Sequence, residues 1–220
     1  MRYPKVNYIG NKEKIADWIA SVIPEDATSF FDAFCGGCSV SYKAKSLGLQ
    51  VFSNDILTVN YHIAKALIEN DSQTLSEDDL RVIFGGEPTE GFMYSHFANR
   101  FYFPEECREL DRIRSNVELL NHPLKQSLTF ALLRRAMIRK MPYSRFTINW
   151  EKITELRDEE ISYAKYGRRR SYHNKTFRYH FEDNLGRYNE AVFSNGRSNK
   201  AYNLDIYDAI DQVDADVIYL

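Results

Sequence analysis

The chain has 220 residues, enough to bury a hydrophobic core and to form one or two domains. Its formal net charge is −2, so any affinity for a polyanion must come from local basic patches and not from the overall charge. The sequence has no apolar run of about 18 residues that would predict a membrane span, no signal-type segment near its N-terminus and three cysteines, so we expect a cytoplasmic protein without a disulfide framework.

The first part of the chain has the order of a parallel α/β sheet. The predicted elements are a buried strand, a helix, a second strand and a second helix, over residues 29–34, 39–47, 50–53 and 57–69. A glycine pair, Gly36-Gly37, lies in the turn after the first strand, and an acid, Asp55, follows the second strand. This order predicts the opening of a doubly wound sheet, in which ligands bind at the carboxyl ends of the strands.

The middle of the chain interrupts this pattern. Two amphipathic helices are predicted over residues 105–120 and 124–140, each with a proline near its start. Residues 143–188 are polar and aromatic without a clear period, and we expect hairpins and loops there. Strand, helix and strand signals then return over residues 201–205, 206–213 and 215–220.

These patterns predict a discontinuous domain organisation. We expect residues 1–60 and 196–220 to form an α/β core, and residues 61–195 to form an insert of helices and hairpins. The predicted fold class is therefore α/β, with a doubly wound sheet interrupted by the insert.

The turn Cys35-Gly36-Gly37-Cys38 is a candidate ligand site. Glycine there lets a ligand approach the backbone and permits a positive φ, while Asp55 can accept hydrogen bonds from both hydroxyls of a ribose. The full G-x-G-x-x-G pattern is missing, which disfavours a nicotinamide or flavin cofactor. The cysteine spacing also matches a redox motif, but the rest of the thioredoxin order is missing, and no second Cys or His pair completes a zinc site.

Three motifs in order resemble the Dam-like DNA adenine methyltransferases. They are Asn7-Tyr8-Ile9-Gly10-Asn11-Lys12, Phe31-Asp32-Ala33-Phe34-Cys35-Gly36-Gly37-Cys38 and Asn54-Asp55. Residues 134–146 are also similar to the modification enzymes of FokI-type restriction systems, and the resemblance spans essentially the whole chain. It implies a Rossmann-like methyltransferase sheet, S-adenosylmethionine as methyl donor, and double-stranded DNA as partner in restriction–modification.

The resemblance also implies a set of donor-binding residues: Tyr8, Lys12, Phe34, Cys35, Gly36, Gly37, Asp55 and Asp205. Lys12 would donate a charge-assisted hydrogen bond to the donor carboxylate, Asp55 would hold the ribose and Asp205 would contact the adenine ring. Each has a structural alternative. Tyr8 could be a packing aromatic residue and Lys12 a solvated lysine, while Asp55 and Asp205 could cap the helices that follow them.

Two basic clusters fall in the predicted insert. In the first cluster, the residues predicted to contact DNA are Arg134, Arg135, Arg139, Lys140 and Arg145. In the second cluster they are Arg168, Arg169, Arg170, Lys175 and Arg178, and this cluster is interleaved with tyrosines and phenylalanines. Basic side chains neutralise phosphates, arginine reads guanine edges, and aromatic rings stack on a base that has left the duplex. The alternative is a solvated charged face with scattered core aromatics.

In the resembled family, the strand equivalent to residues 216–220 leads into Asp-Pro-Pro-Tyr, which accepts hydrogen bonds from the adenine N6 amine and stacks on the flipped base. That motif does not occur in the 220 residues. We therefore expect an incomplete sheet, no catalytic residue within the chain and no methylation by this polypeptide alone. Three explanations stay open: an incomplete sequence, a natural truncation, or a split enzyme whose downstream chain carries the motif.

The leading functional hypothesis is adenine-specific methylation of duplex DNA. The alternatives are a catalytically inactive fragment that binds DNA and donor, one half of a split methyltransferase, and an RNA methyltransferase with a similar core.

Overall fold

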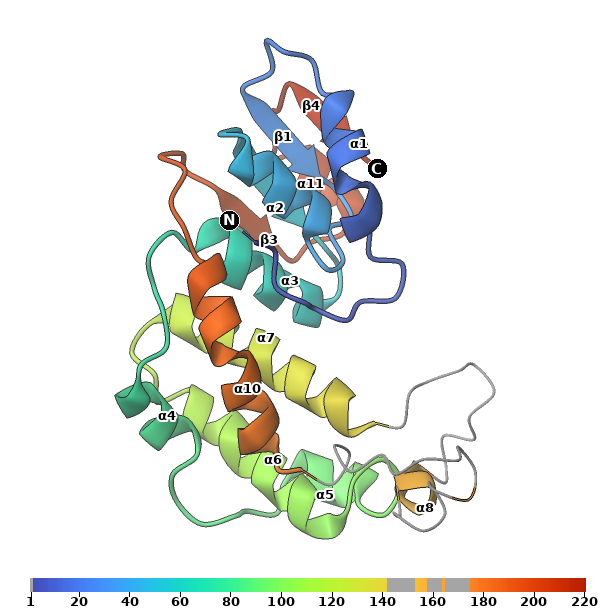
Figure 1. Ribbon diagram of the computed structural model, residues 1–220, viewed down its shortest axis with the longest axis vertical. Coiled ribbons are helices and arrows are strands. Elements are labelled where there is room, and N and C mark those ends of the chain that lie inside the picture. The colour runs from blue at the N-terminus through green and yellow to red at the C-terminus, as the bar shows by residue number, and fades with distance from the viewer. Residues whose placement is uncertain (1, 142–152, 158–163, 165–174) are drawn as a thin grey trace. The chain divides into compact units, whose positions relative to one another are not determined.

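The computed structural model describes residues 2–141, 153–157, 164 and 175–220, which fall into two compact units (Figure 1). The sheet unit consists of Met1–Leu75, His122–Leu132 and Leu185–Leu220, and the helical unit consists of Ser76–Asn121 and Leu133–Asn184. Two of the four boundaries fall within helices, α7 (Pro123–Lys140) and α10 (Phe177–Ala191), and the other two follow Leu75 and Asn121. Residues 61–75, 122–132 and 185–195, which the sequence pattern assigned to the insert, group with the sheet.

The sheet has four parallel strands in the order β3-β2-β1-β4. Their bounds are β1 Ser29–Asp32, β2 Gln50–Asn54, β3 Lys200–Tyr202 and β4 Val217–Tyr219. Asp32 at the end of β1 is paired with Ser53 on β2 and with Tyr219 on β4. This is the strand order of a doubly wound fold, and its topological switch point lies between β1 and β4.

Helices cover the sheet on both faces. After β1 comes α2 (Ser39–Ser46), and the Ser41 hydroxyl donates to Asp32 on that face of the sheet. On the other face, Phe31 packs against Ala209 and Val213, which belong to or follow α11 (Ile206–Ile210). Successive strand residues point to opposite faces of the sheet, so Phe31 and Asp32 contact helices on different faces.

Four further helical segments belong to the sheet unit, in addition to parts of α7 and α10. A 3-10 helix (Glu13–Ile15) and α1 (Ala16–Ser21) precede β1, and α3 (Thr58–Ala64) follows β2 and continues as a π-helix over Lys65–Glu69. The buried Lys45 Nζ donates to the carbonyl oxygens of Leu67 and Asn70 at 3.2 and 2.8 Å, so α2 is tied to the end of that π-helix. Burial lowers the pKa of Lys45 to about 8.

The described part of the helical unit consists of helices. In addition to segments of α7 and α10 it contains α4 (Glu77–Ile83), α5 (Phe92–Phe97), α6 (Pro104–Val117) and α8 (Ile153–Arg157). Ser76 starts α4 with a capping box, and a proline starts α6. Asp111 of α6 accepts hydrogen bonds from the backbone N–H groups of Gly91, Met93 and Tyr94, and so caps α5 from a neighbouring helix.

The predicted α/β fold class is confirmed, but one prediction of local structure is wrong. Residues 177–188, expected as hairpins and loops, belong to α10. Phe177, Phe181, Asn184 and Tyr188 are buried at helical spacing, and the polar and basic residues between them obscure this periodicity in the sequence. Most of residues 143–176 lies outside the described residues. Within the described ranges, no helix combines the length and apolar character needed to cross a membrane.

Asp216 holds the start of β4 against the start of β1. Its Oδ2 accepts hydrogen bonds from the backbone N–H and the hydroxyl of both Thr28 and Ser29, at 2.8 to 3.0 Å. In return, the Asp216 backbone N–H donates to the Ser29 hydroxyl at 2.9 Å. The backbone and hydroxyl donors lower the pKa of Asp216 to about 2, because they favour the charged carboxylate.

Asp216→Asn should therefore weaken the attachment of β4. A depressed pKa stabilises the folded state above the unfolded value of 3.8, and this stabilisation disappears as the pH falls towards about 2. We expect the wild-type protein to lose stability between pH 4 and 2 more steeply than Asp216→Asn in denaturant titrations. Asp214→Asn, which removes the same charge two residues earlier, should follow the wild-type profile, and equal profiles for all three proteins would contradict the prediction.

Candidate functional site

The carboxyl ends of β1, β2 and β3 bring three loops of the sheet unit together. Asn54, the last residue of β2, is 1% exposed and bridges them. Its Nδ2 donates to the carbonyl oxygens of Ala33 and Leu204 at 3.3 and 3.1 Å, and its Oδ1 accepts from the Leu204 N–H at 3.1 Å. One buried amide thus fixes the three loops relative to one another.

A second amide, that of Asn203, links the loops after β2 and β3. Its Nδ2 donates to the carbonyl oxygens of Asp55 and Ile56 at 2.8 and 3.0 Å, and its Oδ1 accepts from the Thr58 hydroxyl at 3.1 Å. Ile56 and Leu57, next to these hydrogen bonds, are more than half exposed. The carboxyl edge of the sheet therefore has fixed polar groups next to exposed apolar side chains.

The glycine turn after β1 lies directly against the N-terminal segment. Gly36 has φ +50°, and a Cβ built there would come within 2.7 Å of Cε1 of the Tyr8 ring. At Gly37 the same construction meets Tyr8 Cβ at 3.0 Å, and the Tyr3 hydroxyl donates to the Gly37 carbonyl oxygen. Both glycines are therefore needed for the ring of Tyr8 to cover the turn.

Asp55 fastens this turn to β2. It is 7% exposed, its Oδ2 accepts from the Gly36 N–H at 2.9 Å, and its Oδ1 accepts from the Leu57 N–H at 2.9 Å. Each oxygen of a carboxylate can accept a further hydrogen bond, so Asp55 can hold the turn and also receive donors from a ligand.

A second acid, Asp32, is buried at the end of β1. One oxygen, Oδ2, accepts from the Ser41 hydroxyl, whereas Oδ1 is buried without a hydrogen-bond partner among the described residues. Burial is the largest influence and raises the pKa of Asp32 to about 6; the hydrogen bond from Ser41 opposes this shift, and the charge of Asp55 adds to it. A buried acid with an unused oxygen is a candidate ligand group.

The two cysteines of the turn are buried thiols. The hydrogen bond with Cys38 and burial raise the pKa of Cys35, and burial raises the pKa of Cys38. Raised pKa values keep both groups protonated near neutral pH, which disfavours a nucleophilic redox pair. In the described part of the chain, no group of three or more His, Cys, Asp or Glu side chains is arranged to hold a metal ion.

The remaining predicted donor-binding residues lie at the surface. Lys12 is exposed and its Nζ donates to the Gly10 carbonyl oxygen at 3.2 Å, while Phe34 is 57% exposed. Asp205 is the N-cap of α11 and its Oδ1 accepts from the Tyr207 N–H at 3.0 Å. The capping alternative for Asp205 is therefore confirmed, and its exposed carboxylate is still accessible to a ligand.

The predicted DNA-contacting residues are distributed unevenly between surface and interior. Arg134 and Arg139 on α7 are partly exposed, and Lys175 and Arg178 are exposed. Arg178 pairs with Glu182 on α10 at 2.7 Å. The other four predicted arginines lie outside the described residues: Arg145, Arg168, Arg169 and Arg170.

Two of the predicted DNA contacts are buried. Lys140 is 2% exposed and its Nζ lies 2.7 Å from Glu106 Oε1, while Arg135 is 5% exposed and its Nε lies 3.5 Å from the Asn184 Oδ1. Neither side chain is at the surface to meet a phosphate in this structure. We therefore remove both from the set of proposed DNA contacts, because their positive charges are engaged inside the helical unit.

The sequence interpretation did not single out three residues of this site. Asp32, Asn54 and Asn203 were not assigned roles of their own, although each is a polar residue at or just after the end of a strand. A polar residue that closes an apolar strand at the carboxyl edge is the signal that could have identified them.

Comparison with known proteins identifies the family. A model of the D12 class N6 adenine-specific DNA methyltransferases matches residues 8–220. The type II methyltransferase M2.HphI of Haemophilus parahaemolyticus is 57% identical over 219 residues, which cover 100% of this chain and 65% of that protein. M.FokI of Planomicrobium okeanokoites is 28% identical over 98% of this chain and 34% of its own length.

The type II methyltransferase M.CviAII of Paramecium bursaria Chlorella virus 1 is 32% identical over 52% of this chain and 38% of its own length. The chain thus spans about two thirds of the first of these relatives and little more than a third of the other two. Because the family model covers nearly the whole of it, the chain belongs to the D12 class of N6 adenine-specific DNA methyltransferases.

Proposed function

We propose that the protein transfers a methyl group from S-adenosylmethionine to N6 of adenine in duplex DNA, as part of a restriction–modification system. The observation that carries this proposal is the match of residues 8–220 to the family model, together with the glycine turn and acids at the carboxyl edge of the sheet. The cytoplasm, where DNA and the donor are both present, is the proposed location.

The charge of the site suits this donor. S-adenosylmethionine carries a sulfonium and an ammonium group, and two buried acids, Asp32 and Asp55, lie at the ends of β1 and β2. An unpaired buried carboxylate oxygen on Asp32 is costly unless a ligand or water satisfies it. We propose that Asp32 attracts the cationic end of the donor and that Asp55 accepts hydrogen bonds from its ribose.

The remaining donor contacts are proposed at the edges of the same turn. Tyr8, Gly36 and Gly37 would form the surface against which the donor lies, with Cys35 as a buried support. The exposed Lys12, Phe34 and Asp205 would contact the carboxylate, the methionine end and the adenine ring, respectively. S-adenosylmethionine supplies an electrophilic methyl group, and the role of the chain is to bind and orient it.

The proposed DNA contacts are Arg134, Arg139, Lys175 and Arg178, with Arg145 and Arg168–Arg170 outside the described residues. In the family the Asp-Pro-Pro-Tyr segment follows the strand equivalent to β4, whose last residue, Tyr219, is paired with Asp32. That segment would then join the donor site at the switch between β1 and β4. A separate downstream chain finds no support in the relatives, since M2.HphI is a longer single protein.

The direct test is methyl transfer by the product of the complete gene. With labelled S-adenosylmethionine and duplex DNA, we expect label in N6-methyladenine, and an excess of RNA duplex should not compete. Gly36→Ala should weaken donor binding by about tenfold or more, because the new Cβ meets the Tyr8 ring and the positive φ is strained.

Gly196→Ala is the matched control. Gly196 also has a positive φ, +74°, but nothing lies within 4 Å of its added Cβ. This variant carries the backbone strain without the contact, so its donor affinity in calorimetry should equal that of the wild type. The proposed function is wrong if the complete protein neither binds the donor nor modifies adenine.

Asp32 gives the donor site a pH dependence. Protonation of Asp32 below about pH 6 removes the negative charge that attracts the donor, so donor affinity should fall as the pH decreases through 6. The same raised pKa destabilises the ligand-free folded state as the pH rises from 3.8 to about 6, and the full penalty is present above pH 6.

Asp32→Asn separates these two effects. At pH 8 this variant should be about 1–3 kcal/mol more stable than the ligand-free wild type, because the buried charge is removed, and its donor affinity should be weak and independent of pH between 5 and 8. Chemical denaturation and calorimetry measure the two quantities. A donor affinity that equals the wild-type value at pH 8 would exclude a role for Asp32 in binding.

The second basic cluster is tested by its salt dependence. Replacing Arg168, Arg169 and Arg170 by alanine should remove about three phosphate contacts and reduce the slope of log K against log salt by about 3. Fluorescence anisotropy with a mixed-sequence DNA duplex measures the slope, and donor affinity should not change. An unaltered DNA affinity and slope would exclude this cluster from the interface.

A further inference from the structure

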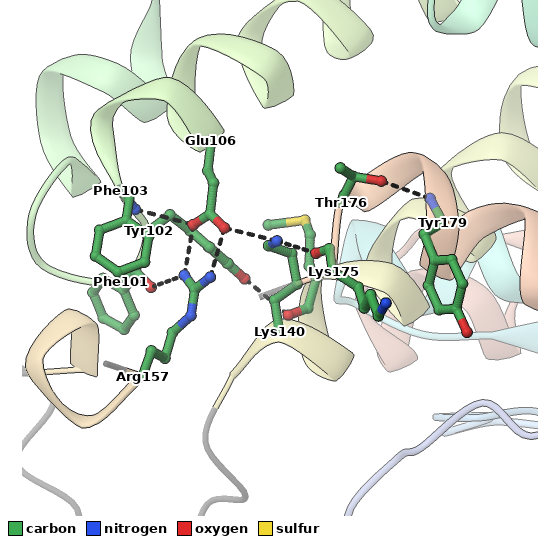
Figure 2. A network of polar contacts seen from close by, with 10 residues as sticks. Phe101, Tyr102, Phe103, Glu106, Lys140, Arg157, Lys175, Thr176 and Tyr179 are labelled. Atoms are coloured by element: carbon green, nitrogen blue, oxygen red, sulfur yellow. Dashed lines mark hydrogen bonds and ion pairs between the residues drawn. The ribbon is translucent and has the colours of Figure 1, made fainter. Parts of the chain in front are cut away.

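A cluster of buried charges lies in the helical unit, formed by Glu106 of α6, Lys140 at the end of α7 and Arg157 at the end of α8 (Figure 2). We call it the Glu106 cluster. The two terminal nitrogens of Arg157 donate to the two carboxylate oxygens of Glu106 at 2.5 and 2.6 Å, and Lys140 Nζ lies 2.7 Å from Oε1. Glu106 Oε2 also accepts from the Phe103 N–H at 3.0 Å, at the start of α6.

The cluster is closed off from solvent by aromatic rings. The side chains of Arg157, Lys140 and Glu106 are 0%, 2% and 11% exposed. The guanidinium carbon of Arg157 lies 4.8 Å from the centre of the Phe103 ring, and Lys140 Nζ lies 4.9 Å from that of Phe177. Cation–π contacts of this kind are strengthened by desolvation, so the rings add to the ion pairs in holding the two cations in place.

Burial opposes the charge on Glu106, but the hydrogen bonds and charges of Arg157 and Lys140 outweigh it, and the pKa of Glu106 is lowered. The two cations thus favour the charged form of Glu106, while burial lowers the pKa of Lys140 against the opposing effect of the Glu106 charge. Buried ion clusters of this type contribute little more to stability than well-packed apolar residues would, but they fix geometry because a displaced partner leaves a buried charge unpaired. The main effect of the Glu106 cluster is therefore to fix the positions of the chain segments that carry its side chains.

The places of these residues in the chain indicate which segments the Glu106 cluster holds in position. Lys140 ends α7, shortly before residues 142–152, and Arg157 ends α8, between these residues and residues 158–174. Lys140 Nζ also donates to the backbone carbonyl oxygen of Lys175, where the chain continues towards α10. Figure 2 shows Arg157 and Lys140 meeting at Glu106, with the Lys175 carbonyl group bound to Lys140. The first stretch therefore begins and ends beside a cation bound to Glu106, and the second begins at Arg157 and ends at the carbonyl group that Lys140 binds.

These two stretches carry the arginines proposed to meet DNA: Arg145 in the first, and Arg168, Arg169 and Arg170 in the second. We infer that Glu106 is a positioning residue for DNA recognition, which fixes the ends of both basic stretches through Lys140, Arg157 and the Lys175 carbonyl group. Lys140 then acts on DNA binding from inside the protein, without touching DNA. This inference rests on the proposed function and names the residue that organises its DNA interface.

The experiment measures DNA binding of the complete protein by fluorescence anisotropy, with a mixed-sequence DNA duplex, at a temperature where circular dichroism shows every variant folded. Glu106→Gln removes the charge that joins the two cations. Lys140→Met is the milder second variant, because it cuts the link to the Lys175 carbonyl group and leaves the Glu106–Arg157 pair intact. Both should weaken DNA binding by about tenfold and reduce its salt slope.

Asp111→Asn provides the matched control. Asp111 is a buried carboxylate on the same helix, and it bonds the backbone of Gly91, Met93 and Tyr94 instead of the ends of the basic stretches. This variant should lower the melting temperature and leave the DNA affinity of the folded protein unchanged. Equal losses of affinity in Asp111→Asn and Lys140→Met would reduce the Glu106 cluster to a general stabilising role and overturn the inference.

The decisive measurement repeats Glu106→Gln and Lys140→Met in a background in which Arg168, Arg169 and Arg170 are alanine. If the cluster acts by positioning these arginines, neither substitution should weaken DNA binding further in that background. A full additional loss there would overturn the inference, as would unchanged DNA affinity in the original background. Donor calorimetry and methyl transfer by the unmodified protein decide the proposed function separately, so the two can fail independently.

Discussion

The bond between Asp55 and the Gly36 N–H is the contact on which the sheet unit's site depends. It joins the loop after β1 to the loop after β2, and the same carboxylate holds the Leu57 N–H before α3. Together with the hydrogen bond from the Cys35 N–H to the Asn54 carbonyl oxygen, it attaches the glycine turn to the neighbouring strand and supports the surface that Tyr8 covers. A ligand that hydrogen bonds to Asp55 therefore meets a carboxylate already oriented by two backbone donors.

Asp32 in the sheet unit and Glu106 in the helical unit show opposite behaviour. Asp32 has an oxygen without a partner among the described residues and a raised pKa, whereas Glu106 is saturated by two cations and has a lowered pKa. The first pattern is typical of a group that meets its partner only in a complex, and the second of a group that has found its partners within the fold. These patterns agree with the proposed roles of Asp32 in donor binding and of Glu106 in positioning.

Much of the sheet could be predicted from the sequence, because its strands are short apolar runs that end in polar residues and its glycine turn has a distinctive composition. The candidate site residues Asp55 and Gly36 follow from the same pattern and from the family resemblance. The path of residues 177–188 could not be predicted, since the buried faces of Phe177, Phe181 and Tyr188 are separated by polar and charged residues. The burial of Lys140 could not be predicted for a related reason: it depends on Glu106 and Arg157, which are distant in sequence.

The cover over the glycine turn has a practical consequence for anyone preparing fragments of this protein. Tyr3 and Tyr8 belong to an N-terminal stretch without helix or strand, which would usually be trimmed or fused to an affinity tag. Here that stretch supplies both the ring over Gly36 and the hydroxyl bonded to Gly37. A recombinant boundary placed after Tyr8 would remove this aromatic wall together with the buried Val6, so the N-terminal stretch belongs in any fragment meant to bind a ligand.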